Sequence, residues 1–90
     1  MKGFKGKTAV ITGAASGIGY ALAEKFANEG MNIVLADIEQ DALDIAVKKI
    51  SDIGVESYGI NIDVMHKDSV EHLFNESVKA FNKVHILCNN

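Results

Sequence analysis

Residues 8–19 of the chain read TAVITGAASGIG, and this stretch decides the fold. The first five residues are apolar or β-branched, which is typical of a strand buried on both faces. Gly13 then lets the chain turn sharply off the strand, Gly17 lets the backbone approach a pyrophosphate, and Gly19 lets a helix pack closely on the sheet. Free N–H groups and the helix dipole favour an anion at this helix start. The alternative is a glycine-bearing turn without a ligand.

The rest of the chain alternates between helical periodicity and short apolar runs. Apolar spacing of three and four residues predicts helices over about residues 17–29, 41–53 and 70–81. Further strands are expected at residues 32–37, 57–62 and 84–89. Ile18 begins the apolar spacing of the first helix, and we expect Phe74 and Phe81 of the third to face the core.

Helix ends are marked by residues with known terminal preferences. Gly30 and Gly54 are placed to end the first two helices. Asp68 or Ser69 can cap the start of the third.

The resulting βαβαβαβ order specifies the fold class. It predicts a single α/β domain over residues 1–90, with a parallel sheet and right-handed crossovers. In a doubly wound sheet of Rossmann type, four such strands lie in the order 3-2-1-4. Ligands bind at the point where the strand order reverses, beside the carboxyl end of the first strand. The glycine loop is expected at that point.

Asp37 is the second candidate binding residue, because it closes the second strand 18 residues beyond Gly19. A carboxylate there can accept hydrogen bonds from the adenosine ribose hydroxyls and repels a 2′-phosphate. The neighbouring Ile38 and Ser16 offer no cation to offset that repulsion. NAD is therefore favoured over NADP. The alternative is a solvated aspartate at a strand end.

Weaker signals lie further along the chain. Asp63 and Val64 follow the third strand, where a short acid can accept from the adenine amino group, although a turn or helix cap explains such an Asp as well. The three histidines lack metal-ligand spacing and are expected at the surface. Cys88 lies among apolar neighbours and is expected to be a small core residue.

Composition narrows the classes of protein further. The net charge is −3 and the nine Lys and Arg are scattered, which argues against a nucleic-acid or anionic-membrane surface. No apolar run approaches the roughly 18 residues of a membrane span, and no secretory signal is recognisable. A single cysteine fits a reducing compartment, so we expect a cytoplasmic protein.

Together these motifs resemble the classical short-chain dehydrogenase/reductase family. Residues 12–19 match its TGxxxGxG loop, and residues 63–64 resemble its adenine-contacting pair. Residues 87–90, LCNN, resemble the approach to its NNAG motif. The family catalyses NAD(P)-dependent hydride transfer between a nicotinamide cofactor and an alcohol or ketone.

The resemblance also implies residue roles. Asn89 would stabilise the central sheet and Asn90 would lie near the cofactor. The remaining cofactor-binding positions it implies are Gly13, Ser16, Gly17, Ile18, Gly19, Asp37, Ile38, Asp63 and Val64.

The family's catalytic Ser and Tyr-x-x-x-Lys lie beyond its NNAG motif, and no residue in 1–90 is assigned to them. In this family the tyrosine acts as the general acid and base, and the lysine lowers its pKa. We therefore expect a truncated cofactor-binding part that is inactive alone, taken from a parent enzyme that forms a homo-oligomer. A bare fourth strand and a partly uncovered sheet face support the same expectation.

Two other functions stay open on the sequence alone. A non-catalytic dinucleotide-binding module for redox sensing or assembly would need the same loop without the catalytic residues. An S-adenosylmethionine-dependent methyltransferase also has a glycine loop after its first strand and an acid after its second. The TGxxxGxG spacing and the terminal asparagine pair argue against the methyltransferase.

Overall fold

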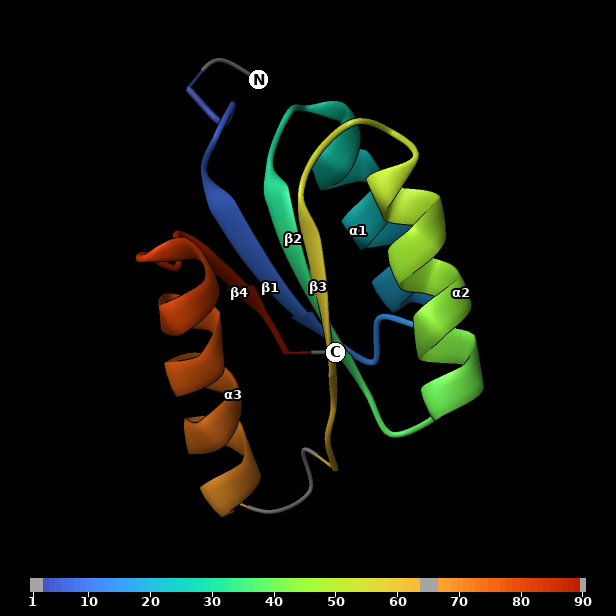
Figure 1. Cartoon of the computed structure of the whole chain (residues 1–90), viewed down its shortest axis with the longest axis vertical. Coiled ribbons are helices and arrows are strands. Elements are labelled where there is room, and N and C mark those ends of the chain that lie inside the picture. Colours follow the sequence, from blue (N-terminus) through green and yellow to red (C-terminus); the bar gives the residue numbers. More distant parts are fainter. Residues whose placement is uncertain (1–2, 64–66, 90) are drawn as a thin grey trace.

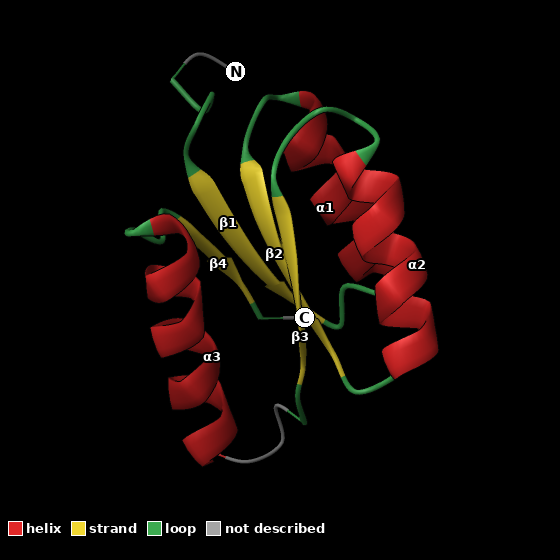
Figure 2. Cartoon of the chain, viewed as in Figure 1, coloured by secondary structure: helices red, strands yellow, loops and turns green. Residues whose placement is uncertain are grey.

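The computed structural model describes residues 3–63 and 67–89. These residues form a sheet with helices on both faces (Figures 1 and 2). The elements, in chain order, are β1 (Thr8–Thr12), α1 (Gly17–Asn28), β2 (Asn32–Asp37), α2 (Gln40–Ser51), β3 (Ser57–Asn61), α3 (Lys67–Phe81) and β4 (Ile86–Cys88). All strand pairs are parallel and their order is β3-β2-β1-β4, which confirms the predicted topology.

The sheet separates two hydrophobic cores. Helices α1 and α2 cover one face and α3 covers the other (Figure 1). Because strand side chains alternate between faces, Ile11 and Leu35 belong to the core beneath α1 and α2, while Val10 and Val34 belong to the core beneath α3. All five residues of β1 are buried, as the near-continuous apolar run predicts.

Helix α1 packs on the sheet through small residues. Its buried positions are Gly19, Ala23 and Ala27, which recur every four residues. Ile18, which begins the apolar spacing of α1, lies at the carboxyl ends of the strands with 72% of its surface exposed. A helix that approaches the sheet closely places Gly and Ala, not large side chains, in the contact.

The helix ends follow the glycine signals but not the capping signal. Gly30 adopts a φ of +88°, its N–H donates to the Ala27 carbonyl, and the Met31 N–H donates to the Phe26 carbonyl. This pattern is a Schellman motif, which uses the last carbonyls of α1. Helix α3 begins at Lys67, so Asp68 and Ser69 lie in its first turn and neither is its cap.

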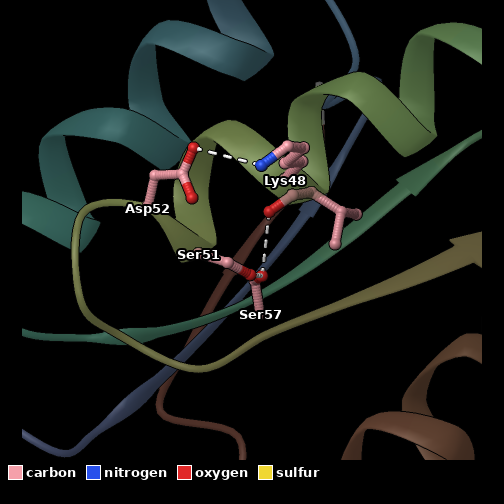
Figure 3. A network of polar contacts seen from close by, with 5 residues as sticks. Lys48, Ser51, Asp52 and Ser57 are labelled. Atoms are coloured by element: carbon pink, nitrogen blue, oxygen red, sulfur yellow. Dashed lines mark hydrogen bonds and ion pairs between the residues drawn. The ribbon is translucent and has the colours of Figure 1, made fainter.

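Helix α2 contacts β3 through close packing and through hydrogen bonds that involve serine hydroxyls. A Cβ added at Gly59 would lie 2.8 Å from Val47 Cγ2, so α2 approaches β3 more closely than a side chain there allows. The Ser57 hydroxyl contacts the Ser51 hydroxyl and donates to the Val47 carbonyl at 3.1 Å (Figure 3). The nearby Lys48–Asp52 ion pair is exposed on both sides and contributes little to stability.

The face beneath α3 is less completely covered than the other. A cavity of about 520 Å³ lies between α3 and strands β1 and β4, and Phe74 and Leu87 are in its lining. Phe74 was expected in the core, but half of its surface is exposed. Phe81, on the same helix, does pack against the second core, as expected.

Candidate dinucleotide-binding site

The candidate site lies where the carboxyl ends of neighbouring strands meet. Thr12 at the end of β1 pairs with Ala36, and Asp37 at the end of β2 pairs with Asn61 of β3. This register places the glycine loop beside the loop that follows β2. The residues that the sequence placed at one rim are therefore neighbours in space.

Two glycines shape the loop after β1. Gly13 and Gly17 both have a φ of +60°, a conformation that L side chains rarely adopt. A Cβ at Gly17 would meet no heavy atom within 4 Å, so this position needs glycine for its backbone angle and not for close packing inside the protein. Space therefore remains open beside the Gly17 backbone. Between the two glycines, the Ala14 N–H donates to the Ala36 carbonyl at 3.1 Å.

The start of α1 is suited to an anion. Ser16, in the N-cap position, has an extended backbone and its side chain makes no capping hydrogen bond. The first turn of α1 contains no acidic residue, so no side chain of this turn offsets the positive end of the helix dipole. Ser16, Gly17 and Ile18 are all exposed. Backbone N–H groups here are thus available to bound phosphate oxygens.

Asp37 lies directly against this loop. Its Oδ2 accepts a hydrogen bond from the Ala15 N–H, and its Oδ1 accepts one from the Glu39 N–H, both at 3.0 Å. An ionised carboxylate has about four acceptor positions. Two remain for ribose hydroxyls, so the structure is compatible with the role predicted for Asp37.

Asn61 was not singled out from the sequence, yet it supports the same rim. Its side-chain amide donates to the main-chain carbonyls of Asp37 (3.2 Å) and Ile38 (2.9 Å). The Ile62 N–H also donates to the Asp37 carbonyl. An amide side chain at the last position of a strand was the available signal, but its partners lie on another strand and no local pattern reveals them.

Two of the other predicted contact residues, Ile38 and Asp63, lie among the described residues. Ile38 lies in the loop after β2 with 58% of its surface exposed. An apolar side chain must be exposed in this way to contact the adenine ring of a ligand. Asp63 lies beyond β3 and is partly buried. Val64 and Asn90 lie outside the described residues.

Thr12 links β1 to the chain beyond β4. Its buried hydroxyl lies 3.1 Å from Asn89 Oδ1 and 3.4 Å from the Cys88 carbonyl oxygen. The expected sheet-stabilising role of Asn89 therefore has a specific partner in the glycine motif itself. Cys88 is partly buried against the first core.

Other kinds of site find no support in the part of the chain that the structure describes. It holds no group of three or more His, Cys, Asp or Glu side chains arranged for a metal ion. His85 is exposed, and its Nδ1 accepts the Thr8 N–H at 3.1 Å. Within residues 3–63 and 67–89, no helix has the length and apolar character needed to cross a membrane.

Comparison with known proteins defines the family. The short chain dehydrogenase family matches residues 7–90. Uncharacterized oxidoreductase YxbG of Bacillus subtilis is 40% identical over 90 residues, which is all of this chain and 33% of that protein. NAD-dependent glycerol dehydrogenase of Listeria innocua is 39% identical over 83 residues, or 92% of this chain and 32% of that protein.

Solved structures agree with the sequence relatives. A short chain dehydrogenase/reductase from Burkholderia phymatum in complex with NAD has a TM-score of 0.91 at 46% identity, over 97% of this chain and 31% of that one. L-sorbose reductase from Gluconobacter frateurii, complexed with NADPH and L-sorbose, has a TM-score of 0.92 at 39% identity, over 98% of this chain and 34% of that one.

The fold and the glycine rim define an α/β protein of Rossmann type. The chain belongs to the short chain dehydrogenase family. It spans about a third of the length of the curated relatives it matches. The redox-sensing module and the methyltransferase gain no support from these relatives.

Proposed function

We propose that residues 1–90 form the NAD(H)-binding part of an oxidoreductase that transfers hydride between a nicotinamide cofactor and an alcohol or ketone. One observation carries the proposal. Two positive-φ glycines open the backbone at the uncapped start of α1, and the Asp37 carboxylate lies against the same loop. This combination suits a pyrophosphate flanked by a ribose.

Each residue of the rim has a defined part in this proposal. The backbone at Ser16, Gly17 and Ile18 would hold the pyrophosphate, and Gly13 and Gly19 would set the turn and the close helix packing. Asp37 would accept from the adenosine ribose hydroxyls, and Ile38 would lie against the adenine. When bound, the nicotinamide ring supplies the hydride chemistry, whereas this chain binds and orients the dinucleotide.

Asp63, Val64 and Asn90 complete the proposed contact set. Asp63 and Val64 would contact the adenine, and Asn90 would lie near the cofactor. Their support comes from their positions in the family motifs, since only Asp63 lies among the described residues.

A preference for NAD over NADP is part of the proposal. The carboxylate of Asp37 would repel a 2′-phosphate, and the flanking Ser16 and Ile38 are neutral. The two structural relatives above were solved with different cofactors, NAD in one and NADPH in the other. The argument for this chain therefore rests on its own Asp37.

The family supports a proposal for the substrate class of the parent enzyme. The relatives named for glycerol and L-sorbose both act on polyhydroxy compounds, and we propose an alcohol or ketone for this chain's parent enzyme. Its acid–base residues would lie outside residues 1–90. We also propose a homo-oligomeric parent enzyme, on the family resemblance, and a cytoplasmic one, since a single cysteine fits a reducing compartment.

A matched pair of glycine variants tests the binding site. Gly17 and Gly54 both have positive φ, and a Cβ at either would meet nothing within 4 Å. Gly17→Ala should carry a backbone strain on the order of 1–2 kcal/mol. Gly54→Ala should carry at least as much, because its φ of +114° lies further from the conformations that L side chains adopt. Titration with NADH, followed by nicotinamide fluorescence, should show roughly tenfold weaker binding in Gly17→Ala. A free loop that relieves about 1.4 kcal/mol of strain by leaving the binding conformation must regain that energy on binding, which is a tenfold loss of affinity.

Gly54 lies in the loop between α2 and β3, so Gly54→Ala should bind NADH as the unsubstituted chain does. Equal affinities in both variants would contradict binding at the glycine loop. Thermal unfolding of each variant establishes that the compared proteins are folded.

A further inference from the structure

The Asp37 carboxylate has partners that a residue serving only the ribose would not need. Its Oδ2 accepts from the Ala15 N–H, in the middle of the glycine loop and 22 positions earlier in the chain. Its Oδ1 accepts from the Glu39 N–H, in the segment that leads into α2. The carboxylate thus bridges two loops through main-chain hydrogen bonds that hold without any ligand.

Ala14 and Ala15 pack with the first core, but the described residues give the loop few polar contacts besides this one. Gly13 and Gly17 are the most permissive residues in it, and both adopt positive φ. The Ser16 side chain makes no cap bond. The Ala14 N–H is fixed by the Ala36 carbonyl, which is a main-chain group that no side-chain substitution removes. The Ala15 N–H depends instead on the side chain of Asp37.

We propose that Asp37 is a positioning residue for the phosphate-binding loop as well as the residue that selects the ribose. This inference rests on the proposed function and extends it. The carboxylate would hold the segment around Ala15 in the conformation in which the N–H groups at the start of α1 meet the pyrophosphate. Cofactor selection and pyrophosphate affinity are then coupled through one side chain.

The coupling has a consequence for cofactor exchange. Removing the carboxylate relieves repulsion of a 2′-phosphate but also releases the Ala15 N–H. Asp37→Ala should therefore weaken NADH binding without a matching gain for NADPH. If Asp37 acted on the ribose alone, the Asp37→Ala variant would bind NADH more weakly and NADPH more tightly than the unsubstituted protein.

Amide hydrogen exchange measured by NMR on the full 90-residue chain tests the positioning role without any ligand. The Ala15 N–H should be protected in the unsubstituted protein and should exchange about tenfold faster or more in Asp37→Ala, since a hydrogen bond to a charged group is lost. The Ala14 N–H is the internal control, because its acceptor is the Ala36 carbonyl. Asp37→Asn keeps one acceptor oxygen. Its Ala15 N–H should therefore exchange at a rate between those of the unsubstituted protein and Asp37→Ala.

Titration with inorganic pyrophosphate provides the second readout. Asp37→Asn and Asp37→Ala remove the same charge, so any difference in pyrophosphate affinity reports the remaining acceptor. We expect Asp37→Asn to bind at least threefold more tightly. Equal affinities, or an Ala15 N–H that is unprotected in the unsubstituted protein, would overturn the inference.

The outcomes separate the two proposals. A protected Ala15 N–H in a chain that binds no NADH would contradict the proposed function and leave the positioning role standing. An unprotected Ala15 N–H in a chain that binds NADH would contradict the positioning role and leave the proposed function standing. The measurement on the unsubstituted protein decides the matter even if a variant fails to fold.

Discussion

The hydroxyl of Thr12 lies 3.1 Å from Oδ1 of Asn89, across 77 positions of sequence. Thr12 ends β1 and precedes the glycine loop, while Asn89 follows β4. The contact therefore ties the first residue of the binding motif to the strand that closes the described sheet. Only three residues of β4 pair with β1, so a side-chain link at this end adds to a short ladder.

Replacing Thr12 with Val removes the hydroxyl and keeps the shape of the side chain. Thr12 is buried, and we expect Thr12→Val to lower the free energy of unfolding by about 1 kcal/mol, with Thr12→Ser retaining the hydrogen bond. Urea denaturation measures the change, and amide exchange at Leu87 and Cys88 should quicken in the Val variant alone. Unchanged stability together with unchanged exchange would show that the contact does not hold β4.

Replacing Gly59 with Ala tests the close approach of α2 to β3. The new methyl group would lie 2.8 Å from Val47 Cγ2, and overpacking of this kind typically destabilises by about 1–3 kcal/mol. Val47→Ala removes the opposing methyl groups, so Gly59→Ala should be less destabilising in that background. A double-mutant cycle in urea gives the coupling. Additive effects of the two substitutions would contradict the packing contact.

Tyr20 provides a test of the electrostatics of α1. Burial raises the pKa of its hydroxyl above the ordinary value, and the negative charge of Glu24 raises it further. Because the folded-state pKa is the higher one, the stabilising contribution of the neutral phenol is present below the unfolded-state value and is lost as the pH rises through the folded-state pKa.

Spectrophotometric titration of the Tyr58→Phe variant should place the Tyr20 transition above pH 10. Adding Glu24→Gln should move that transition to lower pH, because it removes the charge. A transition that Glu24→Gln does not move would mean that the glutamate does not influence Tyr20.

The strand order and the site rim were predictable because both depend on local signals that repeat along the chain. Apolar β-branched runs mark the strands, and glycines mark the phosphate loop and the end of α1. The parallel order then follows from the alternation of elements. Asp37 could be placed beside the glycine loop for the same reason, since both follow neighbouring strands.

The sequence did not predict which helix residues are buried, because burial depends on how closely each helix approaches the sheet. Phe74 fits the apolar stripe of α3, yet half of its surface is exposed. In α1 the small residues Gly19, Ala23 and Ala27 form the contact with the sheet. Hydrophobic periodicity weights large side chains, whereas close helix–sheet approach selects small ones.

The polar links of the rim were missed for a different reason. Asn61 donates to the loop after β2, and Asp37 accepts from Ala15, 22 positions away. Partners so far apart in sequence are set by strand register. A local pattern indicates that a polar residue stands at the rim but not which group it contacts.

We propose that this chain binds a nicotinamide dinucleotide at the glycine rim and that Asp37 makes it prefer NADH. Parallel titrations of the unsubstituted protein with NADH and NADPH, followed by nicotinamide fluorescence, test it most directly. We predict saturable binding of NADH and at least tenfold weaker binding of NADPH, since one uncompensated charge repulsion of about 1.4 kcal/mol corresponds to tenfold in affinity. Equal or tighter binding of NADPH, or no binding of either by the folded protein, would contradict it.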